Sequence, residues 1–204
     1  MAELYHDGQR GLQDRFDTRR LADRLEERIV HPTFRDEERE FLERQSMFFL
    51  ASVDAEGRPN CSYKGGTPGF VRVVEDDTLA FPNYDGNGMF LSMGNVAQTG
   101  EVGMLFVDFA GQTRMRVNGE ASIDFDDPLL DSFPEAQLLV RVRAREIFMN
   151  CPRYIHKMEL VEPSVFAPTG DEPPPVPAWK RSDAMREMLP SDDPARDPSR
   201  RTGP

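Results

Sequence analysis

Cysteine, histidine and tryptophan are scarce in this chain of 204 residues, which contains 2, 3 and 1 of them. The two cysteines, Cys61 and Cys151, cannot build the disulfide framework of a small secreted domain. Because no histidine stands at a ligand spacing from either cysteine, they do not form a zinc site. We therefore expect a reducing, cytoplasmic environment.

Long apolar runs and an excess of positive charge are also missing. No apolar stretch approaches the length that crosses a membrane, and the N-terminus, with Glu3 and Asp7, lacks the order of a signal peptide. The formal net charge of -11 gives little support for binding nucleic acid. A local basic pocket for a phosphorylated small molecule stays open, because arginines gather in the second half at Arg114, Arg116, Arg141, Arg143, Arg145 and Arg153.

Two short helices are predicted before the first strand, and we assign residues 1–40 to an N-terminal helical segment. Apolar residues recur at helical spacing from Gly11 to Val30, and His31-Pro32 ends this helix. Thr33 is the expected N-cap of the second helix, which has acidic residues in its first turn. Phe41 and Leu42 form its buried face.

Short runs of β-forming residues separated by tight turns follow. The predicted strands are Met47–Val53, Pro59–Lys64, Phe70–Val74, Thr78–Phe81, Val102–Phe109, Thr113–Asp124, Leu138–Phe148 and Ile155–Val161. Few helices are long enough for parallel crossovers, so the pattern predicts a mainly β protein, an antiparallel barrel or sandwich.

More than half of the 17 prolines lie beyond Phe166. Such a composition cannot bury enough apolar surface to offset its ordering entropy, so we expect an extended or disordered tail over residues 167–204. Trp179, the single tryptophan, is expected to dock on the folded part.

Two segments could contact a ligand. In the first, Ser62–Gly66 and Pro68–Val71, glycines let the backbone approach a ring or phosphate closely, and Lys64 could supply charge. The alternative is a β-bulge and a turn that serve only the sheet. In the second, a Gly/Asn loop from Pro82 to Gly88 enters a short helix and presents N–H donors to an anion. The alternative is a loop that only reverses the chain, since neither a Walker motif nor GxGxxG is present.

Several stretches match a known family in order: FFLASVDAEGRPNCSYKGG, PGFVRVVEDDTLAFPNYDGN, VGMLFVDF and RMRVNGEASI. Over roughly Phe41 to Val161 the chain resembles the pyridoxamine 5′-phosphate oxidase-like family of FMN-binding split barrels. The resemblance implies a six-stranded antiparallel split barrel with flanking helices, placed here at residues 41–166. It also implies a homodimer with FMN at the subunit interface.

The same resemblance implies a set of cofactor-binding residues: Ser62, Tyr63, Lys64, Phe70, Val71, Arg72, Asn83, Tyr84, Asn87, Ser92, Asn95, Arg116, Asn118, Cys151 and Arg153. Cys151 next to Pro152 could be a thiolate and His156 a proton donor. We favour a lining role for both, because the flavin performs the chemistry, and no catalytic residue is assigned. Trp179 would cover the flavin from the partner subunit.

Two departures from the true oxidases change the expected substrate. The loop that carries their basic phosphate clamp reads Asp85-Gly86-Asn87-Gly88 here, and their C-terminal Trp and Arg-Leu substrate motif is not recognisable. We expect an FMN-dependent oxidoreductase acting on an unidentified small molecule. The alternatives are a deazaflavin-dependent reductase, a non-catalytic flavin-binding or stress-associated module, and a split barrel without cofactor that serves as a dimeric scaffold.

Overall fold

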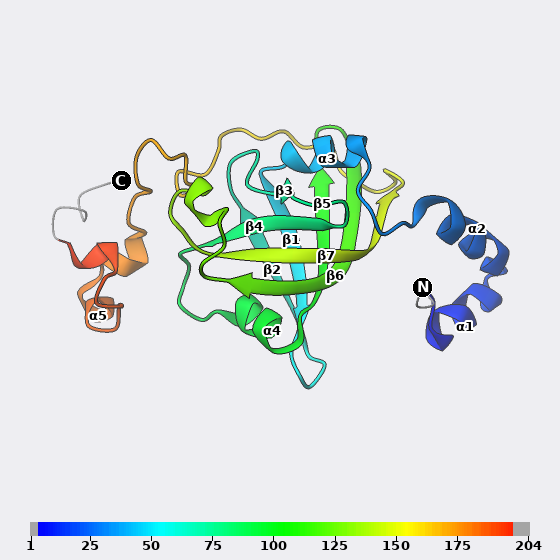
Figure 1. The fold of residues 1–204 in the computed structure, drawn as a ribbon, viewed down its shortest axis with the longest axis horizontal. Helices are drawn as coiled ribbons and strands as arrows, with labels where there is room; N and C mark the ends of the chain where they lie inside the picture. Colours follow the sequence, from blue (N-terminus) through cyan, green and yellow to red (C-terminus); the bar gives the residue numbers. More distant parts are fainter. Residues whose placement is uncertain (1–3, 198–204) are drawn as a thin grey trace.

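In the computed structural model, which describes residues 4–197, one antiparallel sheet of seven strands forms a split barrel (Figure 1). The order of the strands in the sheet is β2-β1-β5-β6-β7-β4-β3. Their bounds are β1 Met47–Val53, β2 Pro59–Gly65, β3 Arg72–Val73, β4 Thr78–Tyr84, β5 Glu101–Asp108, β6 Thr113–Asp124 and β7 Ala136–Asn150. The predicted mainly β, antiparallel split barrel is confirmed.

The sheet has seven strands where six were expected. The short strand β3, which pairs with β4 over only two residues, accounts for the difference. The predicted strand Ile155–Val161 was wrong. That segment pairs with no strand and is almost fully exposed, so its apolar residues do not belong to the core of the barrel.

Alternation along β1 shows how the sequence sets the two faces of the sheet. Phe48, Leu50 and Ser52 are buried, whereas Phe49 is half-buried and Ala51 exposed. The Phe48 ring packs in the barrel against three other rings, with centroid distances of 5.8, 5.0 and 5.1 Å to those of Phe70, Phe81 and Phe106. This aromatic group is the centre of the main hydrophobic core.

The N-terminal region contains α1 (Asp7–Arg15), α2 (Arg19–Ile29) and α3 (Asp36–Glu43). The helix expected from Gly11 to Val30 is interrupted where Asp17 takes a left-handed φ of 51°, so α1 and α2 form a hairpin that projects from one end of the barrel (Figure 1). Arg35, not Thr33, is the N-cap of α3. The predicted burial of Phe41 and Leu42 is confirmed.

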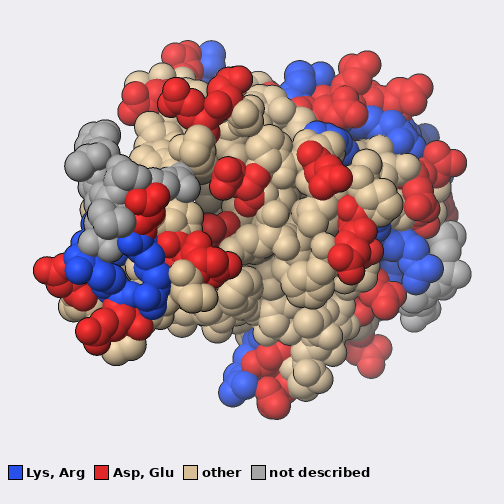
Figure 2. All heavy atoms as spheres, turned by 60° about the vertical axis from the view of Figure 1, so that its left-hand side comes forward, with Lys and Arg blue, Asp and Glu red and all other residues tan. Residues whose placement is uncertain are grey.

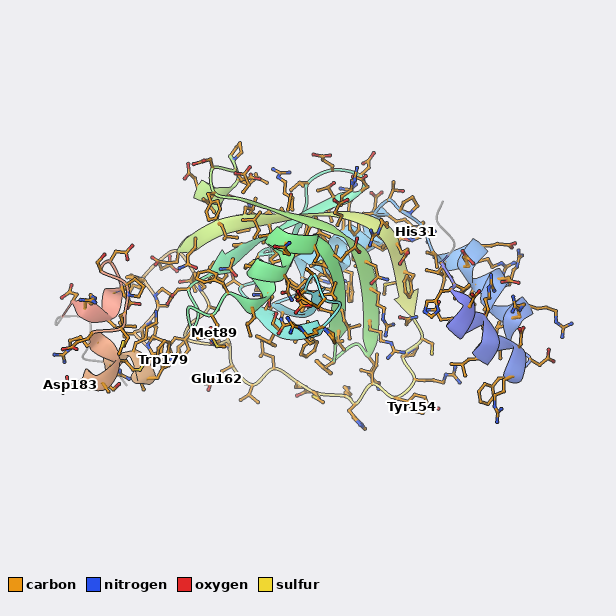
Figure 3. The ribbon with its side chains drawn as sticks, turned by 90° about the horizontal axis from the view of Figure 1, so that it is seen from below. His31, Met89, Tyr154, Glu162, Trp179 and Asp183 are labelled. Carbon is orange, nitrogen blue, oxygen red and sulfur yellow. The ribbon has the colours of Figure 1, made fainter. Side chains whose placement is uncertain are left out.

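After β7 the chain runs along the outside of the barrel, from the end near His31 toward the end near Met89 and Trp179 (Figure 3). We call residues 154–166 the strap. The remaining short elements are η1 Leu130–Ser132, η2 Ala178–Arg181, α5 Asp183–Arg186 and η3 Pro194–Arg196.

The tail differs from the extended or disordered segment expected over residues 167–204. Its described part, 167–197, contains η2, α5 and η3 around a small apolar cluster of Val176, Leu189 and Ala195. The end of the expected segment, 198–204, lies outside the described residues. The domain boundaries at residues 40 and 166 stay a prediction, and the first falls inside α3.

Among the residues that the structure describes, no helix is long and apolar enough to cross a membrane. No group of His, Cys, Asp and Glu in the same part of the chain could hold a metal ion.

Candidate functional site

Five neighbouring strands present a continuous set of side chains on the outer face of the sheet. The strand register aligns Tyr63, Phe49, Leu105, Arg116 and Phe148, which we call the outer row. Directly paired residues share a face, and this face is the one opposite the buried Phe48. Next to the outer row the register aligns Cys61, Ala51, Gly103, Asn118 and Glu146.

The outer row is apolar and aromatic at one side and basic at the other. Tyr63 is 63% exposed and packs edge-on against Phe49, with ring centroids 6.1 Å apart. Leu105 and Phe148 are half-buried without belonging to the core clusters. Asn118 donates from Nδ2 to Glu146 Oε2 at 2.8 Å, which fixes its amide on this face.

Arginines without acidic partners gather where β6 meets the end of β7. Arg114 and Arg116 are two residues apart on β6 and therefore share the outer face, opposite Asn150 and Phe148. The Arg116 guanidinium hydrogen-bonds to Asn150 Oδ1. Arg114 Nε is buried and has no hydrogen-bond partner among the described residues. We call Arg114, Arg116, Asn150 and Arg153 the arginine corner.

Arg114 and Arg116 lie close enough on β6 for their like charges to interact. Burial, and then the neighbouring Arg114, lower the pKa of Arg116. A hydrogen bond from Arg153, at 3.4 Å between Nε and Sγ, lowers the pKa of the exposed Cys151 thiol, and Arg114 adds to this effect. None of the three arginines forms a salt bridge with a described residue. Guanidinium groups without carboxylate partners can bind an anion.

A second group of predicted site residues lies on the opposite face of the sheet, beneath α4 (Leu91–Thr99). The Ser92 hydroxyl lies 2.8 Å from that of Ser62 and accepts a hydrogen bond from Asn60 at 3.1 Å. Asn95 donates to the Ser52 hydroxyl at 3.1 Å. These contacts dock α4 on β1 and β2, so the side chains of Ser62, Ser92 and Asn95 already have partners.

Lys64 lies on the same face as Ser62 and forms no salt bridge with a described residue. Burial lowers the pKa of its ammonium group. It is thus a further half-buried cation without a carboxylate, but on the face opposite the arginine corner.

The third group lies around β3 and β4. Phe70 and Val71 are 3% and 0% exposed, so their side chains belong to the core and only their backbone could contact a cofactor. Arg72 donates to the hydroxyl and carbonyl of Ser132, and its guanidinium lies 4.0 Å from the centroid of the Phe133 ring. Arg72 therefore holds η1 against the sheet.

Asn83 and Tyr84 close β4. The Asn83 amide, buried, donates to Tyr84 O at 3.2 Å and to Gln137 Oε1 at 3.4 Å. Burial raises the pKa of the Tyr84 phenol, while Arg72 acts in the opposite direction.

The loop after Tyr84 is exposed. Asn87 uses its side chain to accept a hydrogen bond from Met89 N at 3.0 Å, which shapes the entry into α4. Asp85 forms a salt bridge with Lys180 of the tail, with 2.5 Å between Oδ2 and Nζ. Trp179, 43% exposed, lines a cavity with Tyr84 of the same chain, and its expected role of covering the flavin from the partner subunit stays a prediction.

The structure thus brings Tyr63, Arg116 and Asn118 to one face of the sheet, with Cys151 and Arg153 near Arg114 just beyond the end of β7. It does not bring them together with the α4 group or with the β3–β4 group. Asn150 was not among the predicted site residues, and Arg114 was named only as one of the arginines that could form a basic pocket. For Arg114 a stronger signal was available, because two arginines at alternate positions of a predicted strand share a face.

The match to a family model covers residues 34–162, and the model is described as pyridoxamine 5′-phosphate oxidase. No curated protein sequence matches the chain.

Several solved structures are similar. The crystal structure of HupZ from Group A Streptococcus is 18% identical, covers 62% of this chain and 99% of its own, and has a TM-score of 0.47. An FMN-binding protein from Syntrophomonas wolfei is 15% identical and covers 69% of this chain and 97% of its own, with a TM-score of 0.42. The heme storage protein HutZ from Vibrio cholerae is 17% identical and covers 55% and 91%, with a TM-score of 0.41.

Proposed function

Because the chain belongs to the pyridoxamine 5′-phosphate oxidase family, we propose that it binds FMN on the outer face of the sheet and acts as an FMN-dependent oxidoreductase. The substrate is a small molecule that is not a substrate of the true oxidases. The observation that carries the proposal is the arginine corner: a concentrated positive charge on a chain of formal net charge -11.

The residues of the arginine corner fit the phosphate of FMN. Guanidinium groups bind phosphate oxygens through paired, charge-assisted hydrogen bonds, and Arg114 still has a buried Nε without an acceptor. A bound phosphate would offset the repulsion between Arg114 and Arg116. The loop Asp85–Gly88 cannot replace the corner in this role, because Asp85 carries the wrong charge and is engaged by Lys180.

The rest of the outer row suits a flat ring system. Phe49, Tyr63 and Leu105 offer an apolar surface beside the corner, and the Asn118 amide offers polar groups next to it. FMN supplies the hydride or electron chemistry when it is bound. The contribution of this chain is to hold the phosphate, support the ring and exclude water from one side of it.

A homodimer with the cofactor at the subunit interface belongs to the same proposal. Exposed apolar side chains on the strap support it, at Met158, Leu160, Val161 and Val165. Monomers rarely expose apolar surface on this scale together with an open aromatic sheet face. A second copy that covered the outer row and the strap from Met158 to Val165 would bury both.

The first test is the spectrum and the mass of the chromophore that co-purifies with the protein. FMN is expected. A deazaflavin would change the cofactor but keep the site, whereas heme or a colourless protein would contradict the proposal. Anaerobic bleaching by NADH or NADPH then separates an enzyme from a flavin-binding module without turnover.

The second test removes the corner. The double variant Arg114→Met, Arg116→Met should weaken FMN binding by about 10- to 100-fold, because hydrogen bonds to charged groups are the strong ones. Arg143→Met is the matched control, since Arg143 is exposed and paired with Glu120 at 3.3 Å. Equal FMN dissociation constants for the double variant and the control would move the phosphate away from the corner.

A further inference from the structure

A cavity of about 400 Å³ lies where the tail meets the end of β4. Its walls are Tyr84 to Gly86, Glu135 and Gln137 on either side of the start of β7, Phe166 at the end of the strap, and the tail from Pro168 to Pro194. This volume lies in the range of small-molecule sites. The cavity is separate from the arginine corner, because the outer row contributes no residue to it.

The tail wall is fixed to the barrel by a buried cation. The side chain of Lys180 is 4% exposed, and its Nζ lies 2.5 Å from Asp85 and 2.7 Å from Asp193. Burial acts against the charge of Lys180, but the two carboxylates outweigh it and raise the pKa of the ammonium group. This network and the apolar cluster of Val176, Leu189 and Ala195 fix the fold of the tail, so the tail wall of the cavity is formed without a ligand.

The charge inside the cavity is negative. Among the described residues that line it, four carboxylates, from Asp85, Glu135, Asp192 and Asp193, stand against one cation, Lys180. Lys180 is already engaged by Asp85 and Asp193, whereas Glu135 and Asp192 form no salt bridge with a described residue. Figure 2 shows acidic side chains gathered around a hollow on the face that carries the tail.

Aromatic rings and prolines make up much of the remaining wall. Phe166 and Trp179 are 49% and 43% exposed, so their rings are accessible to a ligand. Ring faces attract organic cations. Glu135 also has a left-handed φ of 61°, a conformation that a non-glycine residue keeps only where its surroundings enforce it, often at binding sites.

We propose that this tail cavity binds an organic cation, an ammonium or guanidinium group carried on an aromatic or bulky apolar body. Glu135 and Asp192 attract the positive group, and Trp179 and Phe166 contact the apolar body. The same charges reject phosphates and carboxylates, so the cavity and the arginine corner take ligands of opposite sign. The inference stands whether or not the protein binds FMN.

The experiment compares three probes that share a phenyl ring: 2-phenylethylammonium, 2-phenylethanol and 3-phenylpropionate. Trp179 is the single tryptophan, so its fluorescence reports binding in this cavity, and calorimetry gives the affinity independently. The ammonium probe should bind most tightly and the carboxylate most weakly. Flavin-free protein is titrated alongside the protein as purified, so that loss of flavin does not affect the outcome.

Two acid-to-amide variants complete the test. Glu135→Gln and Asp192→Asn should each weaken the ammonium probe by about two- to fivefold, as expected for partly exposed ion pairs, and leave the alcohol unchanged. Glu37→Gln on α3 is the control, because Glu37 is exposed and does not line the cavity. Equal affinity for the ammonium and the alcohol, no binding of any probe, or unchanged affinity in both variants would overturn the proposal.

Discussion

Phe48 and Phe49 are adjacent in β1 but lie on opposite faces of the sheet, so they test the register on which the site depends. Phe48 is fully buried and touches three other rings, whereas Phe49 is half-buried in the outer row and, among the described rings, contacts that of Tyr63. Replacement of each by alanine removes the same atoms. The two variants should therefore differ only through their surroundings.

Phe48→Ala should lower the free energy of unfolding by about 4–5 kcal/mol, near the top of the range for such substitutions, because a large cavity opens among packed rings. Since domains of this size are stable by about 5–15 kcal/mol, the variant should remain only marginally folded. Phe49→Ala should cost about 1 kcal/mol, the value of a single aromatic pair at a half-buried position.

The assay is urea unfolding of the flavin-free protein, followed by circular dichroism and repeated over a wide range of protein concentrations. If a second copy covers the outer row, Phe49→Ala should also make the midpoint less dependent on concentration, because a weakened dimer adds less to apparent stability as the concentration rises. Phe48→Ala should shift the midpoint equally at all concentrations. A loss in Phe49→Ala that equals the loss in Phe48→Ala and does not vary with concentration would refute the assigned faces.

Two further predictions concern the sheet. Gly119 lies at the bulge of β6, where an added Cβ would come within 2.2 Å of Arg143 O. Gly119→Ala should therefore lower the free energy of unfolding by about 1–3 kcal/mol. An unchanged thermal midpoint would contradict this. The hydrogen bond from Arg141, at 2.6 Å, holds the pKa of the buried Asp127 below its usual value. The ionised carboxylate therefore stabilises the fold fully above about pH 3.9, the value in the unfolded chain. This stabilisation is lost as the pH falls through the lower pKa of the folded state. Asp127→Asn should therefore be less stable than the unchanged protein at neutral pH by about 1–3 kcal/mol and equal to it in acid, measured by urea unfolding across pH; a constant difference at all pH values would contradict this.

Elements with clear alternation were predictable from the sequence. The bounds of β1 and β6 match the predicted ones, because polar and apolar residues alternate between two well-marked turns. β4 was predicted to stop at Phe81 but continues through Pro82 to Tyr84. Proline is unfavourable in a ladder, so local propensity ended the strand too early, whereas pairing with β7 extends it.

The functional parts were predictable only where the signal is local. Arg116 and Asn118 could be placed on one face by counting alternate residues. The docking of Lys180 on Asp85 joins positions 95 apart and follows no pattern in either segment, so sequence reasoning expected an unfolded tail there. The assignment of the sixteen predicted residues to an FMN site stays a prediction, and the core positions Phe70 and Val71 can take part only through their backbone.

The unpaired arginines are informative because carboxylates are so abundant in this chain. It has 36 acidic residues against 25 basic ones, so a surface arginine readily finds a partner, and Arg141, Arg143 and Arg145 form salt bridges with Asp127, Glu120 and Glu101. Arg114 and Arg116 are half-buried, lie two residues apart on one strand and have no salt bridge with a described residue, an arrangement that costs free energy through desolvation and repulsion. Binding of an anion would offset this destabilisation. The tail cavity shows the converse. Among the described residues that line it, the one cation, Lys180, is paired with Asp85 and Asp193, and Glu135 and Asp192 form no salt bridge. The two sites should therefore bind ligands of opposite charge, which can be tested without knowing the cofactor. An anion should raise the unfolding temperature by binding the arginine corner, and an organic cation should raise it by binding the tail cavity.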